Sequence, residues 1–166
     1  MIQGQITIDE ELRDSIFDIM INKSLTLSIA ESCTGGFISS FFTSGSGSSA
    51  LFKGSMVTYS NQSKVDLLDI SSKLITKHGV VSKVIVEQMA ESVRKKYHTD
   101  YGLATSGYVE LSNPDLTEPE HTLHAWISIA HSNHTISKCV ILNKNRLENI
   151  THIADVLLNL FRKEII

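Results

Sequence analysis

Helical and strand-like hydrophobic patterns alternate through the first two thirds of this chain, and this alternation limits the available folds more than any other feature. Apolar residues at helical spacing are followed by short apolar runs with polar residues on either side, which are typical of buried strands. Two adjacent strand-like runs come later and predict a hairpin. The whole pattern indicates an α/β fold with a mixed β-sheet covered by helices on both faces.

The expected helices are recognised by apolar residues that recur every three or four positions. They cover, in chain order, residues 7–23, 37–42, 61–70, 82–97 and 147–162. Thr7 has capping-box spacing to Glu10, and Asn61 and Ser82 are the expected N-caps of two later helices.

The expected strands are short and rich in apolar residues. They cover, in chain order, residues 25–29, 55–60, 100–107, 123–131 and 135–142. Ser132 and Asn133 form the expected turn between the last two strands. Residues 43–49 are rich in glycine and serine, and residues 107–122 contain both prolines, so we expect loops at both places.

The composition is that of one ordinary globular domain that spans residues 1–166. Of the 166 residues 42% are hydrophobic, and the formal net charge is −3. The 15 basic residues are scattered, which argues against a nucleic-acid partner. No apolar stretch approaches the roughly 20 residues of a membrane span, so we expect no membrane partner. The polar, acidic start of the chain indicates an unprocessed protein.

Neither the cysteines nor the histidines form a pattern that binds metal. Cys33 and Cys139 are too few for a disulfide framework, and a reducing cytoplasm is the simplest setting for them. The pairs "HTLH" (His121 and His124) and "HSNH" resemble metal ligands, but histidines three residues apart face opposite sides of a strand. No third ligand has suitable spacing, so we predict no metal and no cofactor.

The first candidate for chemistry is "ESCTGG", residues 31–36, which follows a predicted strand and precedes a predicted helix. A glycine turn in this position directs backbone N–H groups to the sheet edge, where the helix dipole favours an anion. The segment matches neither the P-loop nor the dinucleotide-binding pattern. It is either a ligand cradle or a simple turn in which Ser32 or Thr34 caps the helix, and Ser32 is also a candidate nucleophile.

The second candidate is Lys64 in "TYSNQSK", residues 58–64. With Asn61 as the N-cap, its ammonium lies in the first helical turn, where the helix dipole disfavours a cation. A lysine base needs its pKa lowered from about 10.4 to about 7–8, which corresponds to about 4 kcal/mol. The dipole supplies only about 0.3–1 kcal/mol, so burial would have to supply the rest. The alternative is a solvated surface lysine, and Tyr59 is either a packing residue or part of the same site.

Five segments occur in the order and at the spacing found in one known family. They are "AESCTGG" (30–36), "GSSALF" (47–52), "VTYSNQSK" (57–64), "VVSKVIVEQMA" (80–90) and "DYGLATSG" (100–107). On these motifs the chain resembles the C-terminal domain of the competence/damage-inducible protein A (CinA) family, from about Thr7 to its end. The resemblance is most specific between residues 30 and 64, and it implies a three-layer α/β/α domain.

The resemblance also implies a function. Active members of the family deamidate nicotinamide mononucleotide to nicotinate mononucleotide and are similar to serine amidohydrolases with a Ser/Lys dyad. The family's serine and lysine fall on Ser32 and Lys64: Lys64 would take the Ser32 proton while Oγ attacks the carboxamide, and Tyr59 would orient or relay the proton. Backbone N–H groups nearby would hold the oxyanion and the substrate. The residues that carry them are Thr34, Gly35, Gly36, Gly47, Ser48 and Ser49.

Two departures from the family's pattern fall in the part of the site that would surround the nucleotide phosphate. Typical members read "SGIAGP", whereas this chain reads "SGYVELSNP", which retains Ser106 and Gly107 but has bulkier residues in place of a compact glycine loop. A "GDR" motif followed by a second arginine appears as "KNRLENI", with Arg146 retained and Ile150 at the second position. Ser106, Gly107 and Arg146 are therefore the remaining substrate-binding candidates.

Two functions follow from the resemblance and its departures. The first is hydrolysis of an amide, either nicotinamide mononucleotide or a related amide with a different distal group, by Ser32 and Lys64. The second is a catalytically inactive relative that senses a ligand or forms oligomers. We expect a small nucleotide-like substrate, and a homo-oligomer because family members assemble.

Overall fold

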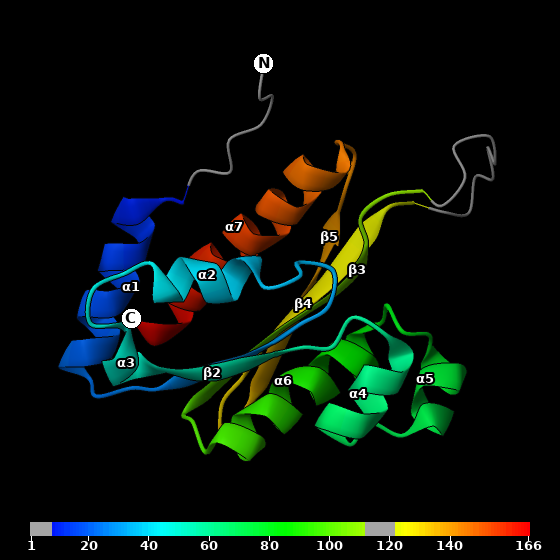
Figure 1. The fold of residues 1–166 in the computed structure, drawn as a ribbon, viewed down its shortest axis with the longest axis horizontal. Coiled ribbons are helices and arrows are strands. Elements are labelled where there is room, and N and C mark those ends of the chain that lie inside the picture. Colours follow the sequence, from blue (N-terminus) through cyan, green and yellow to red (C-terminus); the bar gives the residue numbers. More distant parts are fainter. Residues whose placement is uncertain (1–7, 112–121) are drawn as a thin grey trace.

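The computed structural model describes residues 8–111 and 122–166, and Figure 1 labels its elements. The helices are α1 (Glu10–Asn22), α2 (Phe37–Thr43), α3 (Ser48–Leu51), α4 (Asn61–Leu68), α5 (Ser72–His78), α6 (Lys83–Tyr97) and α7 (Arg146–Ile165). The strands are β1 (Leu27–Glu31), β2 (Phe52–Val57), β3 (Tyr101–Tyr108), β4 (His124–Ala130) and β5 (Thr135–Ile141). Each predicted helix and strand is present, although several begin or end at other residues.

The strands form one mixed sheet in the order β2-β1-β3-β4-β5. β1 is parallel to both β2 and β3, whereas β4 is antiparallel to β3 and to β5. Figure 1 shows α1, α2 and α7 on one face of the sheet and α4, α5 and α6 on the other. The predicted three-layer α/β/α fold with a mixed sheet is therefore confirmed.

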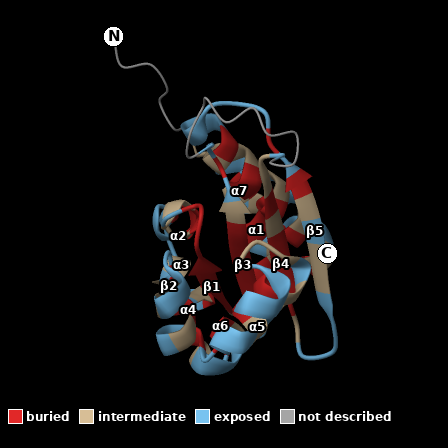
Figure 2. Ribbon diagram, turned by 90° about the vertical axis from the view of Figure 1, so that its right-hand side faces the viewer, coloured by how far each residue is buried: buried red, intermediate tan, exposed pale blue. Residues whose placement is uncertain are grey.

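Side chains alternate across the central strands and divide the core into two layers. Leu27, Ile29 and Leu103 belong to the layer under α1, α2 and α7, while Ala30 and Ala104 belong to the layer under α6. This alternation is the period of two that a pleated strand imposes. Figure 2 shows β1 and β3 buried along most of their length, because helices cover both of their faces.

The carboxyl ends of the three parallel strands meet at one edge of the sheet. Glu31 at the end of β1 is in register with Val57 of β2 and Thr105 of β3. The segments that carry Ser32 and Tyr59 leave the sheet at this edge. In open α/β sheets ligands bind outside the carboxyl ends of the strands, so the fold brings Ser32 and Tyr59 to the expected place.

Two predicted helix caps are wrong. Asp9 caps α1 by accepting a backbone hydrogen bond in the first turn, and Thr7 lies outside the described residues. Ser60, rather than Asn61, caps α4, and Ser60 and Ser63 form a reciprocal capping box. Both errors arise because these sequences place several good cap residues side by side, and hydrogen-bond geometry decides among them.

The first two strands are each displaced from their predicted positions. β1 starts two residues after Leu25 and continues to Glu31, because the loop that follows satisfies that buried carboxylate. β2 starts at Phe52 rather than at residue 55, since the Phe52 ring stacks on Phe42 in the core.

Helical turns replace parts of two predicted connections, and a strand extends into a third. α3 occupies the end of the predicted loop 43–49, and α5 is a short helix with too few apolar positions to show a period. β3 extends into the predicted loop 107–122, of which residues 112–121 lie outside the described residues. Ser82 caps α6 as predicted. Within the described ranges, no helix is both long enough and apolar enough to cross a membrane.

Candidate active site

Ser32 and Lys64 come together from the ends of two neighbouring strands. Lys64 Nζ lies 3.0 Å from Ser32 Oγ and donates to the carbonyl oxygen of Thr58 at 2.7 Å. The contact forms because Ser32 directly follows β1, Thr58 directly follows β2, and these strands pair in parallel. A hydroxyl in hydrogen-bond contact with an amine is the arrangement that an activated serine requires.

Lys64 occupies a position on α4 that an apolar residue would normally fill. Its side chain is 1% exposed, and Leu68, one turn later, is the other buried residue of this helix. Burial penalises the ammonium and lowers the pKa of Lys64 from 10.5 to about 8. At pH 7 about one such amine in ten is neutral, against fewer than about one in 10³ for a free lysine. Lys64 is therefore not a solvated surface lysine.

Cys33 lies beside Ser32 and is also buried. Burial raises the pKa of its thiol from 9.0 to about 12, so the thiolate is scarce near neutral pH. Ser32 is consequently a better nucleophile candidate than its neighbour.

The chain's own carboxylate occupies the anion cradle at the start of α2. Glu31 is fully buried and accepts hydrogen bonds from the backbone N–H groups of Gly36, Ile38 and Ser39. It also accepts from the hydroxyls of Thr34 and Ser39, and the five distances range from 2.5 to 3.1 Å. An anion in this position is favoured by the helix dipole and by charge-assisted hydrogen bonds. These donors therefore hold Glu31 rather than a ligand.

The remaining predicted backbone donors divide into two groups. Gly35 and Gly36 have φ of 60° and 100°, which glycine adopts without strain, and they form the turn between the predicted nucleophile and α2. Gly47 caps α3, and Ser48 and Ser49 begin that helix. In the part of the chain that the structure describes, none of these five residues lines the pocket that contains the predicted nucleophile.

Ser32 faces a cavity of about 230 Å³ at the carboxyl edge of the sheet. Six predicted site residues line it: Ser32, Tyr59, Lys64, Ser106, Gly107 and Arg146. Ser106 is buried, and its hydroxyl donates to the Val80 carbonyl at 2.9 Å, so it fixes the segment before α6. A Cβ at Gly107 would come within 2.5 Å of Ala125 Cβ, so strand packing requires this glycine.

Tyr59 and Arg146 interact on the exposed side of the cavity. Arg146 donates from Nη2 to Tyr59 Oη at 2.8 Å, and its Nη1 lies 3.5 Å from Glu110 Oε2. Tyr59 is 60% exposed, and among the described residues it has no hydrogen bond to Ser32 or Lys64. The structure thus places Tyr59 with the substrate-binding candidates rather than with the Ser/Lys pair.

Two buried polar residues shape this site without belonging to a predicted role. Glu31 is one, and the sequence pattern that could have identified it is a charged residue at the end of an apolar strand. Asn149 on α7 is the other: it is fully buried and donates to the carbonyls of Val109 at 2.9 Å and Lys144 at 2.7 Å. The sequence pattern that could have identified Asn149 is a polar residue on the apolar face of a helix, four positions before Ile153. Asn149 joins the end of β3 to the start of α7.

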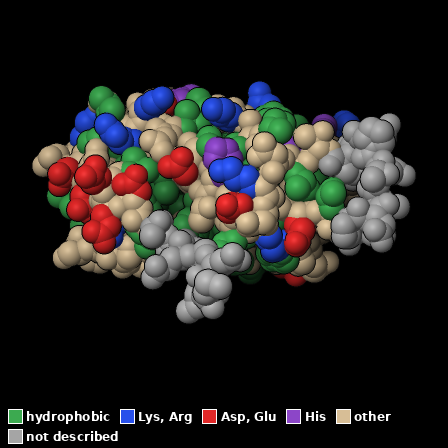
Figure 3. Space-filling model, turned by 90° about the horizontal axis from the view of Figure 1, so that it is seen from above, with side chains coloured by type: hydrophobic (Ala, Val, Ile, Leu, Met, Phe, Trp, Pro, Cys, Tyr) green, Lys and Arg blue, Asp and Glu red, His purple; other side chains and the backbone are tan. Residues whose placement is uncertain are grey.

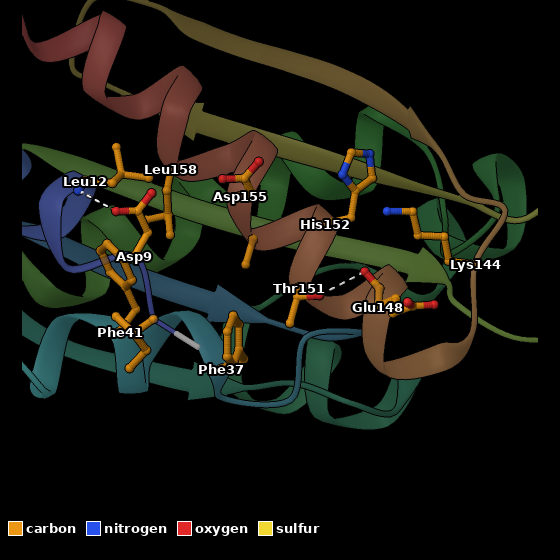
Figure 4. A pocket seen from close by; sticks show the side chains of 12 residues that line it. Asp9, Leu12, Phe37, Phe41, Lys144, Glu148, Thr151, His152, Asp155 and Leu158 are labelled. Atoms are coloured by element: carbon orange, nitrogen blue, oxygen red, sulfur yellow. Dashed lines mark hydrogen bonds between the residues drawn. The ribbon is translucent and has the colours of Figure 1, made fainter. Parts of the chain in front are cut away.

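A second cavity, of about 250 Å³, lies between α1, α2 and α7. Figure 4 shows that Phe37 and Phe41 reach it from α2, while His152 and Leu158 reach it from α7. Among the residues that the structure describes, none of the predicted catalytic or substrate-binding side chains lines it. The candidate chemistry is therefore confined to the Ser32 pocket.

The surface charges and histidines add no second candidate. Figure 3 shows Lys and Arg side chains at several separate places on the face that it presents, and most of the Asp and Glu side chains toward its left end. Of the two histidine pairs, His121 lies outside the described residues, and His134 Nε2 contacts Glu164 Oε1 at 2.5 Å. Across residues 8–111 and 122–166, no group of three or more His, Cys, Asp or Glu side chains could hold a metal ion.

Solved structures with the same fold define the class of domain. A competence/damage-inducible protein from Agrobacterium tumefaciens matches with a TM-score of 0.84 at 24% identity, over 96% of this chain and 97% of that one. A CinA superfamily protein from Enterobacter cloacae matches with a TM-score of 0.86 at 22% identity, over 100% of this chain and 96% of that one. The chain therefore has the α/β fold of competence/damage-inducible proteins.

The sequence comparisons assign the family. CinA-like proteins from Cytophaga hutchinsonii and Flavobacterium psychrophilum are 34% and 38% identical over 94% and 95% of this chain. The chain spans 37% of the length of each of these relatives. A model of the CinA C-terminal domain matches residues 9–165. The chain belongs to the CinA C-terminal domain family, as its motifs predicted.

Proposed function

We propose that this chain is a serine amidohydrolase that releases ammonia from a primary carboxamide of the nicotinamide mononucleotide type. The observation that carries the proposal is the 3.0 Å contact between Ser32 Oγ and Lys64 Nζ, together with a lysine pKa lowered to about 8. An effective general base needs a pKa near the working pH and reach to the proton that it takes. Membership of the CinA family supports the choice of this amide.

The hydrogen bonds of Lys64 suit it to act as a base. A neutral amine has two N–H groups and one lone pair. One N–H donates to the Thr58 carbonyl at 2.7 Å and so fixes the position of Nζ. The lone pair is then free to accept the Ser32 hydroxyl proton, because the carbonyl cannot donate.

The proposed reaction has two halves. Ser32 Oγ bonds to the carboxamide carbon while its proton passes to Lys64 Nζ, which then protonates the amide nitrogen so that ammonia leaves. Water attacks the resulting ester on Ser32, and its proton passes through Lys64 Nζ to Oγ as the carboxylic acid is released. The net change is one amide and one water converted to one acid and one ammonia.

The amide of Cys33, which directly follows Ser32 and lines the pocket, is the best candidate to stabilise the oxyanion, whereas Thr34, one residue further along, does not line the pocket. Within residues 8–111 and 122–166 neither amide has a hydrogen-bond acceptor, whereas Gly35 and Gly36 donate to groups of the chain itself. The N–H that directly follows a nucleophilic serine forms part of the oxyanion hole in other hydrolases. This assignment adds Cys33 to the predicted backbone donors.

The test is to incubate the protein with nicotinamide mononucleotide and with the corresponding riboside, and to measure ammonia and the acid product together. We expect ammonia release that is lost in Ser32→Ala and in Lys64→Met. Ser132→Ala, in the turn between β4 and β5, is the matched control and should keep full activity. Undiminished ammonia release by Ser32→Ala would contradict the proposal. Stabilisation by a ligand with no ammonia release would instead favour the ligand-binding alternative.

A further inference from the structure

The cation that the pocket offers to a substrate is already engaged by the chain itself. Among residues 8–111 and 122–166, the charged side chains that line the pocket are those of Lys64, Glu110 and Arg146. Lys64 lies at the reacting end, in contact with Ser32. Arg146 Nη1 lies 3.5 Å from a Glu110 carboxylate oxygen, and its Nη2 donates to Tyr59. Apart from the Ser32–Lys64 contact, the described lining of the pocket therefore holds one positive and one negative charge side by side.

The side chains of Arg146 and Glu110 are 43% and 60% exposed, but the fold anchors the backbone just before Glu110. The preceding residue, Val109, is 5% exposed and packs in the core, so the chain is anchored immediately before Glu110. Asn149, fully buried, binds the Val109 carbonyl at 2.9 Å. Asn149 follows Arg146 by three residues on α7, so the two lie on neighbouring positions of one helix face. One helix thus places both members of the ion pair.

We propose that the Arg146–Glu110 pair makes this pocket select carboxamides whose distal end carries no phosphate, such as a nucleoside rather than a nucleotide. The identity of the reacting group rests on the proposed function above. A phosphate monoester carries about −1.5 to −2 charge at pH 7, and it would have to displace Glu110 from Arg146 or lie against its carboxylate. A hydroxyl can accept from Arg146 or donate to Glu110 without adding charge.

The test measures binding, so that it does not depend on turnover. In the Ser32→Ala background, calorimetry compares nicotinamide riboside with nicotinamide mononucleotide, with and without Glu110→Gln. We expect the riboside to bind at least as tightly as the mononucleotide when Glu110 is present. Glu110→Gln should tighten mononucleotide binding about 3- to 10-fold and leave riboside binding unchanged. Glu11→Gln removes an exposed carboxylate of α1 and is the matched control for net charge.

A third variant, Arg146→Ala, identifies the partner of the phosphate. In the Glu110→Gln protein the Arg146 guanidinium is free to bind the phosphate, so adding Arg146→Ala should weaken mononucleotide binding strongly. When Glu110 is present, Arg146 is engaged by its carboxylate, and Arg146→Ala should weaken mononucleotide binding only slightly. The inference is overturned when the mononucleotide binds more tightly than the riboside and Glu110→Gln leaves the ratio of the two dissociation constants unchanged. Absence of binding by both probes in all variants would also overturn it.

The two proposals fail in different ways. Ammonia release that requires Ser32, combined with a riboside-to-mononucleotide ratio insensitive to Glu110, would support the amidohydrolase and refute the selection against phosphate. Selective tightening of mononucleotide binding by Glu110→Gln, without ammonia release from either compound by the unmodified protein, would support the selection and refute the amidohydrolase.

Discussion

Lys64 should make the stability of this domain rise with pH, and replacing it by methionine should remove that rise. The pKa of Lys64 is about 8 in the folded chain, because burial lowers it from an ordinary value of 10.5. Between these two values the unfolded chain binds more protons than the folded chain, so the free energy of unfolding increases with pH. The cost of burying the Lys64 ammonium is present in full below the folded-state pKa of about 8 and disappears above the ordinary pKa of 10.5.

The size of the effect follows from the two pKa values. Their difference corresponds to about 3 kcal/mol of unfolding free energy. About 1.3 kcal/mol should be recovered between pH 7 and pH 9, and about 2.5 kcal/mol between pH 7 and pH 10. Lys64→Met also leaves the Thr58 carbonyl without its partner, but that loss does not vary with pH. Burial raises the pKa of Cys33 to about 12, so up to about pH 10 it stays a thiol in both folded proteins and its contribution to the comparison nearly cancels.

The assay is urea unfolding at several pH values, followed by the fluorescence of Trp126, the single tryptophan. The difference in unfolding free energy between the unmodified chain and Lys64→Met should grow with pH by the amounts given above. Lys73→Met, at an exposed position of α5, should follow the unmodified chain at every pH. Parallel pH profiles for the unmodified chain and Lys64→Met would refute the reasoning, because Lys64 would then bind protons equally in both states.

Three further substitutions test the supports of the site, each by its effect on the free energy of unfolding. Glu31→Gln should cost about 2–3 kcal/mol because an amide nitrogen then faces buried N–H donors. The exposed Glu11→Gln should cost almost nothing. Equal effects of the two substitutions would contradict the role of Glu31 as the acceptor for the N–H groups at the start of α2. Asn149→Ala should cost about 2–4 kcal/mol because two carbonyls lose their donor, and a cost below about 1 kcal/mol would argue against the anchor. Gly102→Ala places a Cβ 2.1 Å from the Ala90 carbonyl oxygen, so a loss of about 2–3 kcal/mol is expected, and unchanged stability would show that α6 can move away.

The predicted fold agrees with the structure because it depends on local patterns. The 3.6-residue period of residues 83–97 and the apolar runs of β3, β4 and β5 are set by which side chains must be buried, and a sequence displays them directly. The ends of elements were less predictable. Ser60 and Asn61 are both good caps, and only the hydrogen bond from the Ser63 amide separates them.

The site was predicted in part, for a similar reason. Ser32 and Lys64 were marked by motif and by an unfavourable position at a helix start, both of which are visible in sequence. The role of Glu31 was not, because a glutamate next to a glycine turn shows no sign of whether its carboxylate faces solvent or the amides of α2. The sequence left residues 31–36 as either a ligand cradle or a simple capping turn, whereas the structure fills the cradle with the chain's own anion.

The sequence by itself determined the order of helices and strands, the family, and which residues are candidates for the site, because each of these depends on composition and spacing along the chain. Only the tertiary structure decided how those residues behave. The Ser32–Lys64 contact joins residues 32 positions apart, and the Arg146–Glu110 pair joins residues 36 positions apart. Burial of the Lys64 amine, and pairing of the Arg146 guanidinium with a carboxylate, arise from such distant contacts, since the surroundings of a group in space are not visible in the sequence.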